Sequence, residues 1–161
     1  ISYTATITNK DGDKVYVSTV EYDSDSKISK YNAEIGGSKS TIYFTENEYV
    51  FCQTEDNCIK YSNNSVNASS FDPNTISFDE KQINELKNSS VFKETSNCVS
   101  GECEVWKINR EGLESTYYIY TDTKRLAKFE TQTPTGSAEV VYLFKDISLS
   151  LPENAQTIPA Q

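Results

Sequence analysis

The chain has 161 residues, of which 36% are hydrophobic, and it carries a formal net charge of −9 at pH 7. This length fits one domain, and the acidic charge excludes a nucleic-acid partner, which requires clustered lysine and arginine. The sequence contains no histidine, so the most common metal ligand and general base is missing. We therefore expect a non-catalytic protein without a metal or another cofactor.

Alternating hydrophobic and polar residues fill most of the first sixty positions. Strands are expected at residues 2–8, 14–22, 28–35, 41–45, 48–53 and 58–61. Each segment is rich in Val, Ile, Thr, Tyr or Phe and is bounded by a polar turn. The Asp-Gly pair at residues 11–12 predicts a hairpin between the first two strands. The short connections predict an antiparallel meander.

A helix is expected to interrupt the strands in the middle of the chain. Residues 62–70 are rich in Asn and Ser and predict a loop. Ser77, followed three residues later by Glu80, predicts a capping box. The helix is expected at residues 79–88, with Ile83 and Leu86 on one face.

Strands are expected again at residues 104–109, 115–121, 126–132 and 138–144, and the last is expected to continue to Pro152. The first half of this last strand is hydrophobic on both faces, whereas an exposed antiparallel strand is hydrophobic on one. The helix is the expected lid over the second face, leaving either a groove for a hydrophobic ligand or a solid core. The predicted fold class is α+β, mainly β, an antiparallel sheet with a short helical lid insert.

The four cysteines form two closely spaced pairs. Cys52 and Cys58 bracket one polar turn, and Cys98 and Cys103 bracket another. Each pair is spaced for a disulfide across a hairpin, worth about 2 kcal/mol on the loop-entropy model, and neither has the C-x2-C spacing of a zinc site. Disulfides are favoured over free thiols or a metal site, and they predict an extracytoplasmic location: cell envelope, cell surface or secreted.

The chain is expected to form one domain. We predict strands in residues 1–61, a loop and helix in 62–95, strands in 96–152 and a tail in 153–161. The chain begins inside an alternating strand and contains no Met, which suggests that an N-terminal segment of the precursor is missing. No hydrophobic run reaches the roughly 18 residues of a membrane span, so no transmembrane segment is expected.

Two other motifs predict little about function. The acidic pairs Asp11/Asp13 and Asp23/Asp25 lie in polar turns, where aspartate hydrogen-bonds its own backbone, and a calcium loop would need further ligands. Glycosylation sequons begin at Asn63, Asn67 and Asn88, but this motif is frequent by chance.

Aromatic side chains on the predicted strands are the candidate ligand-binding residues. The alternation leaves open which parity faces a ligand, and tyrosine is also simply a good strand former. No G-x-S-x-G turn or phosphate-binding glycine loop is present. The candidate binding residues are Phe51, Tyr118, Tyr120, Phe129, Tyr142 and Phe144.

The C-terminal third resembles the closing half of the LolA/LppX-like superfamily of periplasmic and envelope lipoproteins. The resemblance rests on a W-x-I strand, a Y-x-I-Y-T-D-T-K-R-L strand and turn, and a V-x-Y-x-F-x-D-I segment that ends in Leu-Pro. These positions are Trp106, Ile108, Tyr118, Tyr120, Asp122, Leu126, Phe129, Tyr142, Phe144, Asp146, Ile147 and Pro152.

The resemblance implies a strongly curved antiparallel sheet, a half-barrel meander wrapped around helices. The cavity of such a half-barrel holds acyl chains or the lipid anchor of a lipoprotein. This sequence departs from the family pattern in lacking a leading helix and in having two closely spaced cysteine pairs.

Two functions compete at this stage. The first is a binding domain for a lipid or another hydrophobic ligand, acting by burial without a covalent step. The alternative is a cell-surface structural or protein-interaction module, in which the partner is another envelope protein or a further copy of the chain in a repeating assembly. A hydrolase with an unrecognised dyad is a third hypothesis, since fold does not determine function.

Overall fold

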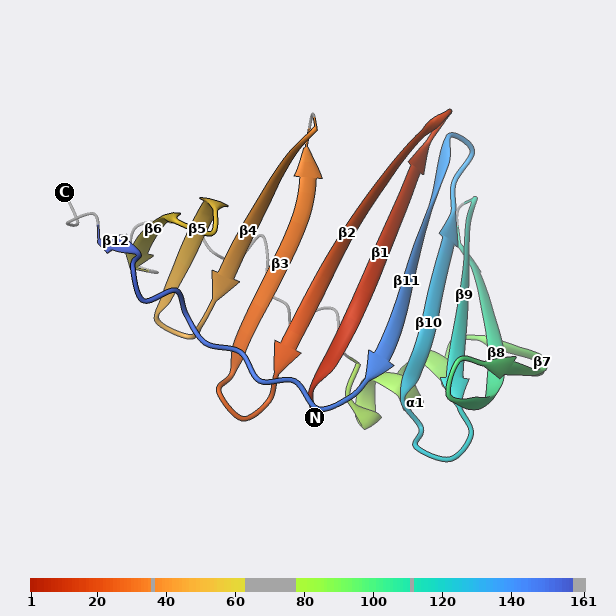
Figure 1. Cartoon of the computed structure of the whole chain (residues 1–161). Helices are drawn as coiled ribbons and strands as arrows, with labels where there is room; N and C mark the ends of the chain where they lie inside the picture. The colour runs from red at the N-terminus through yellow and green to blue at the C-terminus, as the bar shows by residue number, and fades with distance from the viewer. Residues whose placement is uncertain (36, 63–77, 111, 158–161) are drawn as a thin grey trace. The chain divides into compact units, whose positions relative to one another are not determined.

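A computed structural model describes residues 1–35, 37–62, 78–110 and 112–157 (Figure 1). In these residues the chain forms one helix and twelve strands, so the predicted mainly β, antiparallel fold class is confirmed. The helix is α1 (Glu80–Asn88). The strands are β1 (Tyr3–Asp11), β2 (Lys14–Asp23), β3 (Ile28–Ile35), β4 (Ser38–Phe44), β5 (Glu48–Thr54), β6 (Asn57–Ser62), β7 (Val91–Cys98), β8 (Gly101–Arg110), β9 (Leu113–Tyr120), β10 (Leu126–Gln132), β11 (Gly136–Phe144) and β12 (Gln156–Thr157).

The strands follow the order β12-β6-β5-β4-β3-β2-β1-β11-β10-β9-β8-β7. Strands β2 to β6 each pair antiparallel with the next along the chain, and so do β7 to β11. The two-residue strand β12 is the exception, because it pairs parallel with β6. This order confirms the predicted meander of hairpins.

The chain divides into two compact units. Unit 1 contains β3 to β6, the N-terminal end of β1, the C-terminal half of β2 and the described chain after residue 143. Unit 2 contains the remaining parts of β1 and β2, the helix α1, the strands β7 to β10 and β11 up to Leu143. The expectation of a single domain across residues 1–161 stays a prediction.

Helix α1 lies where the sequence predicted it, but its cap is different. Asp79 is the N-cap residue, and its side chain accepts a hydrogen bond from the backbone of Gln82, whose side chain accepts one from the backbone of Asp79. This is a capping box, two residues later than the predicted pair. Ser77, the predicted cap, lies outside the described residues, as do the sequons at Asn63 and Asn67.

Two strand predictions were wrong. Residues 91–95 were assigned to the loop and helix segment, but β7 begins at Val91, where a mostly exposed strand shows no alternation of hydrophobic residues. The last strand was expected to reach Pro152 and instead ends at Phe144. From Lys145 the chain leaves the ladder as a tail that crosses strands of unit 1 before β12 pairs with β6 (Figure 1).

The tail is anchored at Asp23, a buried residue at the end of β2. The Asp23 carboxylate accepts hydrogen bonds from the backbone N–H of Leu149 at 2.9 Å, from the Ser26 hydroxyl at 2.7 Å and from the backbone N–H of Asp25 at 2.9 Å. It therefore caps its own turn, as predicted for an aspartate there. These donors, the Leu149 N–H first among them, lower the pKa of Asp23 from 3.8 to about 2.

This shift predicts how stability depends on pH. A carboxylate with a depressed folded-state pKa stabilises the native state above its unfolded pKa of 3.8, and the contribution is lost as pH falls through about 2. We expect the variant Asp23→Asn to be less stable than the native chain at pH 6 and to approach it in stability near pH 2. Guanidinium denaturation between pH 2 and 6 measures the difference, and parallel stability curves for the two proteins would contradict the prediction.

Candidate functional site: an aromatic sheet face in unit 1

Three neighbouring strands of unit 1 align six large hydrophobic residues on one face. Ile42 on β4 lies opposite Phe51 on β5, which lies opposite Ile59 on β6. Two positions away, Phe44, Tyr49 and Tyr61 are aligned in the same way. Directly opposed residues of antiparallel strands point to the same side of a sheet. We call these six residues the aromatic face: Ile42, Phe44, Tyr49, Phe51, Ile59 and Tyr61.

The rings of the aromatic face form a stacked row. The centroids of Tyr49 and Tyr61 lie 4.8 Å apart with an interplanar angle of 10°, and those of Phe44 and Tyr49 lie 6.4 Å apart. Burial, reinforced by the neighbouring Tyr61, raises the pKa of Tyr49, so its hydroxyl stays neutral at physiological pH. The surface therefore combines flat apolar rings with neutral polar edges.

The opposite face of the same strands holds a buried cluster, against which the half-buried Tyr43 of β4 packs. Val50, Cys52 and Cys58 expose only 1%, 4% and 2% of their surface, and Leu151 and Ala155 of the tail pack against them. All six residues of the aromatic face are only half-buried. Because burial of large aromatic side chains is the most stabilising, their partial exposure beside a well-buried opposite face marks a candidate binding surface.

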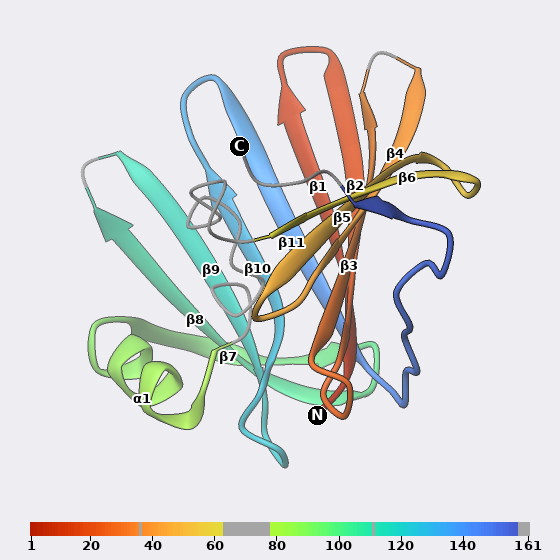
Figure 2. The same ribbon diagram turned by 90° about the vertical axis from the view of Figure 1, so that its left-hand side faces the viewer.

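Unit 2 has a comparable aromatic face, but a helix packs on it. Trp106, Tyr117 and Phe129 are direct neighbours across β8, β9 and β10. Phe78, two residues before α1, places its ring 6.4 Å from that of Tyr117, and Ile83 and Leu86 of α1 are buried. Figure 2 shows α1 close to β7 and β8. The helix segment therefore packs on the side of β8 and β9 that carries Trp106 and Tyr117, and its expected position over the last strand stays a prediction.

Helix α1 is held at its C-terminal end by one lysine. Lys87 forms an ion pair with Glu104 on β8, and its ammonium group lies 5.4 Å from the centre of the Trp106 ring. The Trp106 indole N–H donates to the same Glu104 carboxylate at 3.1 Å. The hydrogen bond from Lys87 lowers the pKa of Glu104 more than burial raises it. A charge-assisted network of this kind favours one position of the helix on the strands.

The predicted binding residues do not share one surface. Phe51 lies on the aromatic face of unit 1, and Phe144, also in unit 1, places its ring 6.2 Å from that of Tyr3. In unit 2, Phe129 pairs with Val140, which has the same parity as Tyr142, so both predicted residues lie on the helix side. Tyr118 and Tyr120 have the opposite parity on β9 to Tyr117 and lie on the other side.

Tyr118 has polar surroundings that suit a hydrophobic ligand poorly. Its hydroxyl donates to Glu130 at 3.0 Å, and Lys128 bridges Glu130 and Glu139 at 2.5 and 2.8 Å. Burial, followed by the Glu130 carboxylate, raises the pKa of Tyr118. Tyr118, Glu130 and Glu139 line a groove of about 470 Å³ whose other lining residues include Thr8, Lys10 and Lys107.

Five residues of the aromatic face escaped prediction from the sequence. Phe51 alone was named, although Ile42, Phe44, Tyr49, Ile59 and Tyr61 lie in strands that were predicted correctly. The alternation of side chains along each strand could have found them. It places Ile42 and Phe44 on the face opposite to Tyr43, and Tyr49 and Phe51 on the face opposite to Val50. Strand pairing then aligns these positions.

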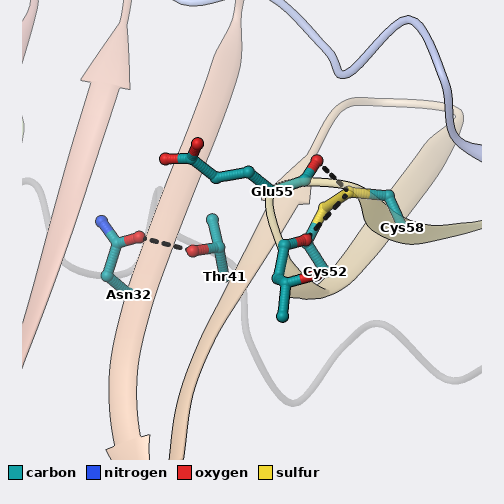
Figure 3. Close-up of a disulfide and its surroundings, with 6 residues drawn as sticks. Asn32, Thr41, Cys52, Glu55 and Cys58 are labelled. Carbon is teal, nitrogen blue, oxygen red and sulfur yellow. Dashed lines mark hydrogen bonds between the residues drawn. A yellow bond between two sulfur atoms is a disulfide. The ribbon is translucent and has the colours of Figure 1, made fainter.

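Both predicted disulfides are present, Cys52–Cys58 and Cys98–Cys103. Figure 3 shows the first, which joins opposed residues of β5 and β6 with Cα atoms 4.1 Å apart. Beside it, the Thr41 hydroxyl donates to the Asn32 side chain at 2.8 Å.

None of the helices in the described part of the chain has the length and apolar composition that a membrane crossing requires.

Comparison with solved structures shows the fold. LprF from Mycobacterium bovis matches 96% of this chain and 90% of its own with 10% sequence identity and a TM-score of 0.60. MucB in complex with MucA(peri) matches 99% of this chain and 57% of that chain, with 8% identity and a TM-score of 0.50. The lipoprotein LppX of Mycobacterium tuberculosis matches 87% of this chain and 84% of its own, with 8% sequence identity and a TM-score of 0.49.

The chain therefore has a LolA/LppX-like fold, with the match to LprF as the main support. No protein-family model matches the sequence, and the search of curated proteins found no match.

Proposed function

We propose that this protein is an extracytoplasmic, non-catalytic binding protein of the LolA/LppX-like superfamily. Its ligand is a lipid or another hydrophobic molecule that contacts the aromatic face of unit 1. Binding proceeds by burial of apolar surface, without a covalent step and without a cofactor. The two disulfides support an oxidising location in the cell envelope, on the cell surface or outside the cell.

One observation carries this proposal. Six large hydrophobic side chains stay half-buried on one side of β4, β5 and β6, while Val50, Cys52 and Cys58 on the other side are almost fully buried, with the half-buried Tyr43 packed against them. A folded chain gains most by burying its aromatic residues, so their residual exposure favours a surface that is completed by a ligand. The fold shared with LprF supports the proposal by analogy only.

The alternative, a protein-interaction module, is favoured by β7. Among the described strands it pairs only with β8, at one end of the strand order. Val91 and Phe92 on this strand expose 60% and 47% of their surface, and the following Val99 exposes 76%. An exposed strand edge with hydrophobic side chains can accept a strand of another protein. MucB, a neighbour in fold, was solved in complex with MucA(peri).

Recovery of the protein without detergent tests the two functions. We expect protein purified from its native envelope, or secreted by a host with an oxidising envelope, to carry a lipid or another hydrophobic small molecule at close to one per chain. Native mass spectrometry gives the mass of the complex, and organic extraction followed by mass spectrometry identifies the ligand class.

The same spectra separate the alternatives. A ligand-free monomer that also fails to bind the apolar probe N-phenyl-1-naphthylamine would contradict the hydrophobic-ligand proposal. A ligand-free chain in a defined complex with itself or with another envelope protein would favour the interaction module.

A further inference from the structure

The tail of unit 1 crosses directly over a disulfide. Leu151 and Ala155 pack against the buried cluster formed by Val50, Cys52 and Cys58. Two anchors hold this segment, one on each side of the contact. The Leu149 N–H donates to Asp23 at 2.9 Å, and Gln156 and Thr157 pair with Ile59 and Lys60, the residues next to Cys58. We call residues 149–157 the strap.

Access to the Cys52–Cys58 bridge is restricted from two sides. On the turn side, the carbonyl oxygens of Thr54 and Glu55 lie 3.8 and 3.7 Å from the Cys58 sulfur (Figure 3). The partial negative charges of these oxygen atoms repel an incoming thiolate. On the other side, Leu151 and Ala155 of the strap pack against the cysteines, and the strap lines the groove of about 630 Å³ through which this side of the bridge is still approached. Only 4% and 2% of the surface of Cys52 and Cys58 are exposed.

The second disulfide is covered at one of its two cysteines. Cys103 is fully buried, whereas Cys98 is only half-buried and the adjacent Val99 exposes 76% of its surface in the turn. Rates of thiol–disulfide exchange depend on access of the attacking thiolate to a sulfur atom. The two disulfides therefore differ in how accessible they are to an attacking thiolate, and this accessibility controls the rate at which each is reduced.

We propose that the strap is a shield for the Cys52–Cys58 disulfide and that the two are coupled: the bridge is reduced only when the strap lifts, and reduction releases the strap. In the reaction, one thiolate of a dithiol reductant attacks a cysteine sulfur and forms a mixed disulfide. Its second thiol then displaces that cysteine and closes a ring. Two electrons and two protons pass to the protein, which gains two thiols, while the dithiol becomes a cyclic disulfide.

Coupling in the reverse direction follows from linkage. The strap packs against the sulfur atoms and pairs with β6 immediately after Cys58. Opening the bridge removes the covalent tie between β5 and β6 beneath Leu151 and so loosens the surface on which the strap lies. Linkage applies to the equilibrium: if the closed bridge favours strap docking, a docked strap must favour the closed bridge over the reduced cysteines to the same extent.

Reduction kinetics test the shield. The folded chain is incubated with dithiothreitol at pH 8, quenched with iodoacetamide and analysed by peptide mass spectrometry, which reports each bridge separately. We expect Cys98–Cys103 to open at least about tenfold faster than Cys52–Cys58. Leu151→Ala should speed reduction of Cys52–Cys58 by about tenfold, equivalent to about 1.4 kcal/mol of strap docking, and leave the rate of Cys98–Cys103 unchanged. Ser148→Ala, at an exposed tail residue, is the control and should change neither rate.

Asp23→Asn provides an independent second variant because it weakens the other end of the strap. It should also accelerate reduction of Cys52–Cys58 selectively. Equal rates for the two native bridges would overturn the proposal, and so would acceleration of both bridges together, which indicates global unfolding.

Hydrogen exchange tests the reverse coupling. Amide exchange across residues 149–157 should rise at least about fivefold in the double variant Cys52→Ala/Cys58→Ala. It should be unchanged in Cys98→Ala/Cys103→Ala, which removes the other bridge. Unchanged exchange in both double variants would overturn the coupling.

Discussion

Replacing Phe51 by serine should weaken binding of an apolar ligand by about tenfold to a hundredfold. Phe51 lies in the middle of the aromatic face, between Ile42 and Ile59. Full burial of a phenylalanine side chain contributes about 1.5–3 kcal/mol, and each 1.4 kcal/mol is about tenfold in affinity. Fluorescence titration with N-phenyl-1-naphthylamine, on protein first stripped of bound lipid, measures the change.

The effect should be specific to the aromatic face. Val15→Ser on β2 is the matched control, because Val15 is a strand residue that already exposes 57% of its surface, and its affinity should stay within about twofold of the native chain. Phe51 is only half-buried, so the Phe51→Ser variant should remain folded. Circular dichroism and thermal unfolding of the variant test this expectation. Unchanged affinity in a folded Phe51→Ser protein would remove the aromatic face as the binding site.

Gly136→Ala should be among the most destabilising single substitutions in unit 2, at about 3 kcal/mol. A Cβ atom at Gly136, the first residue of β11, would overlap the backbone carbonyl oxygen of Lys10 on β1 and lie 3.3 Å from its carbonyl carbon. Backbone atoms cannot rotate away as the end of a side chain can, so the strands must shift. Urea denaturation gives the loss of unfolding free energy.

Gly112→Ala separates this steric effect from the usual cost of losing a glycine. Gly112 adopts φ +82°, and a Cβ atom added there would meet no atom within 4 Å. Alanine at this position should therefore cost about 1 kcal/mol through backbone conformation alone. If Gly136→Ala costs no more than Gly112→Ala, the approach of Lys10 to β11 is looser than the structure shows.

The local structure of this chain followed from short-range patterns. Hairpins from β2 to β6 were predicted because strand residues and turn residues alternate at short spacing. The disulfides were predicted because each cysteine pair brackets a turn. Predictions failed at β7, where exposed residues lack a clear hydrophobic period, and after Phe144, where Ile147, Leu149 and Leu151 alternate as in a strand although the chain has left the ladder.

The candidate site could be predicted only in part. Phe51 was named on chemical grounds, but Tyr118 and Tyr120 were grouped with Phe129 and Tyr142, which point to the opposite side of the unit 2 strands. Strand parity sorts the residues of one strand into two faces. It cannot state which face of one strand matches which face of the next, since that depends on the pairing register.

The amino-acid sequence by itself determined the class of protein: acidic, rich in strands, joined by two hairpin disulfides, and without histidine. Tertiary structure decided which side of unit 1 is closed. The tail lies far along the chain from the β5–β6 bridge, and it reaches the bridge through the contacts of Leu151 and Ala155 with Cys52 and Cys58. Alternation along a strand creates two faces, but only a contact between distant segments selects the face that is buried.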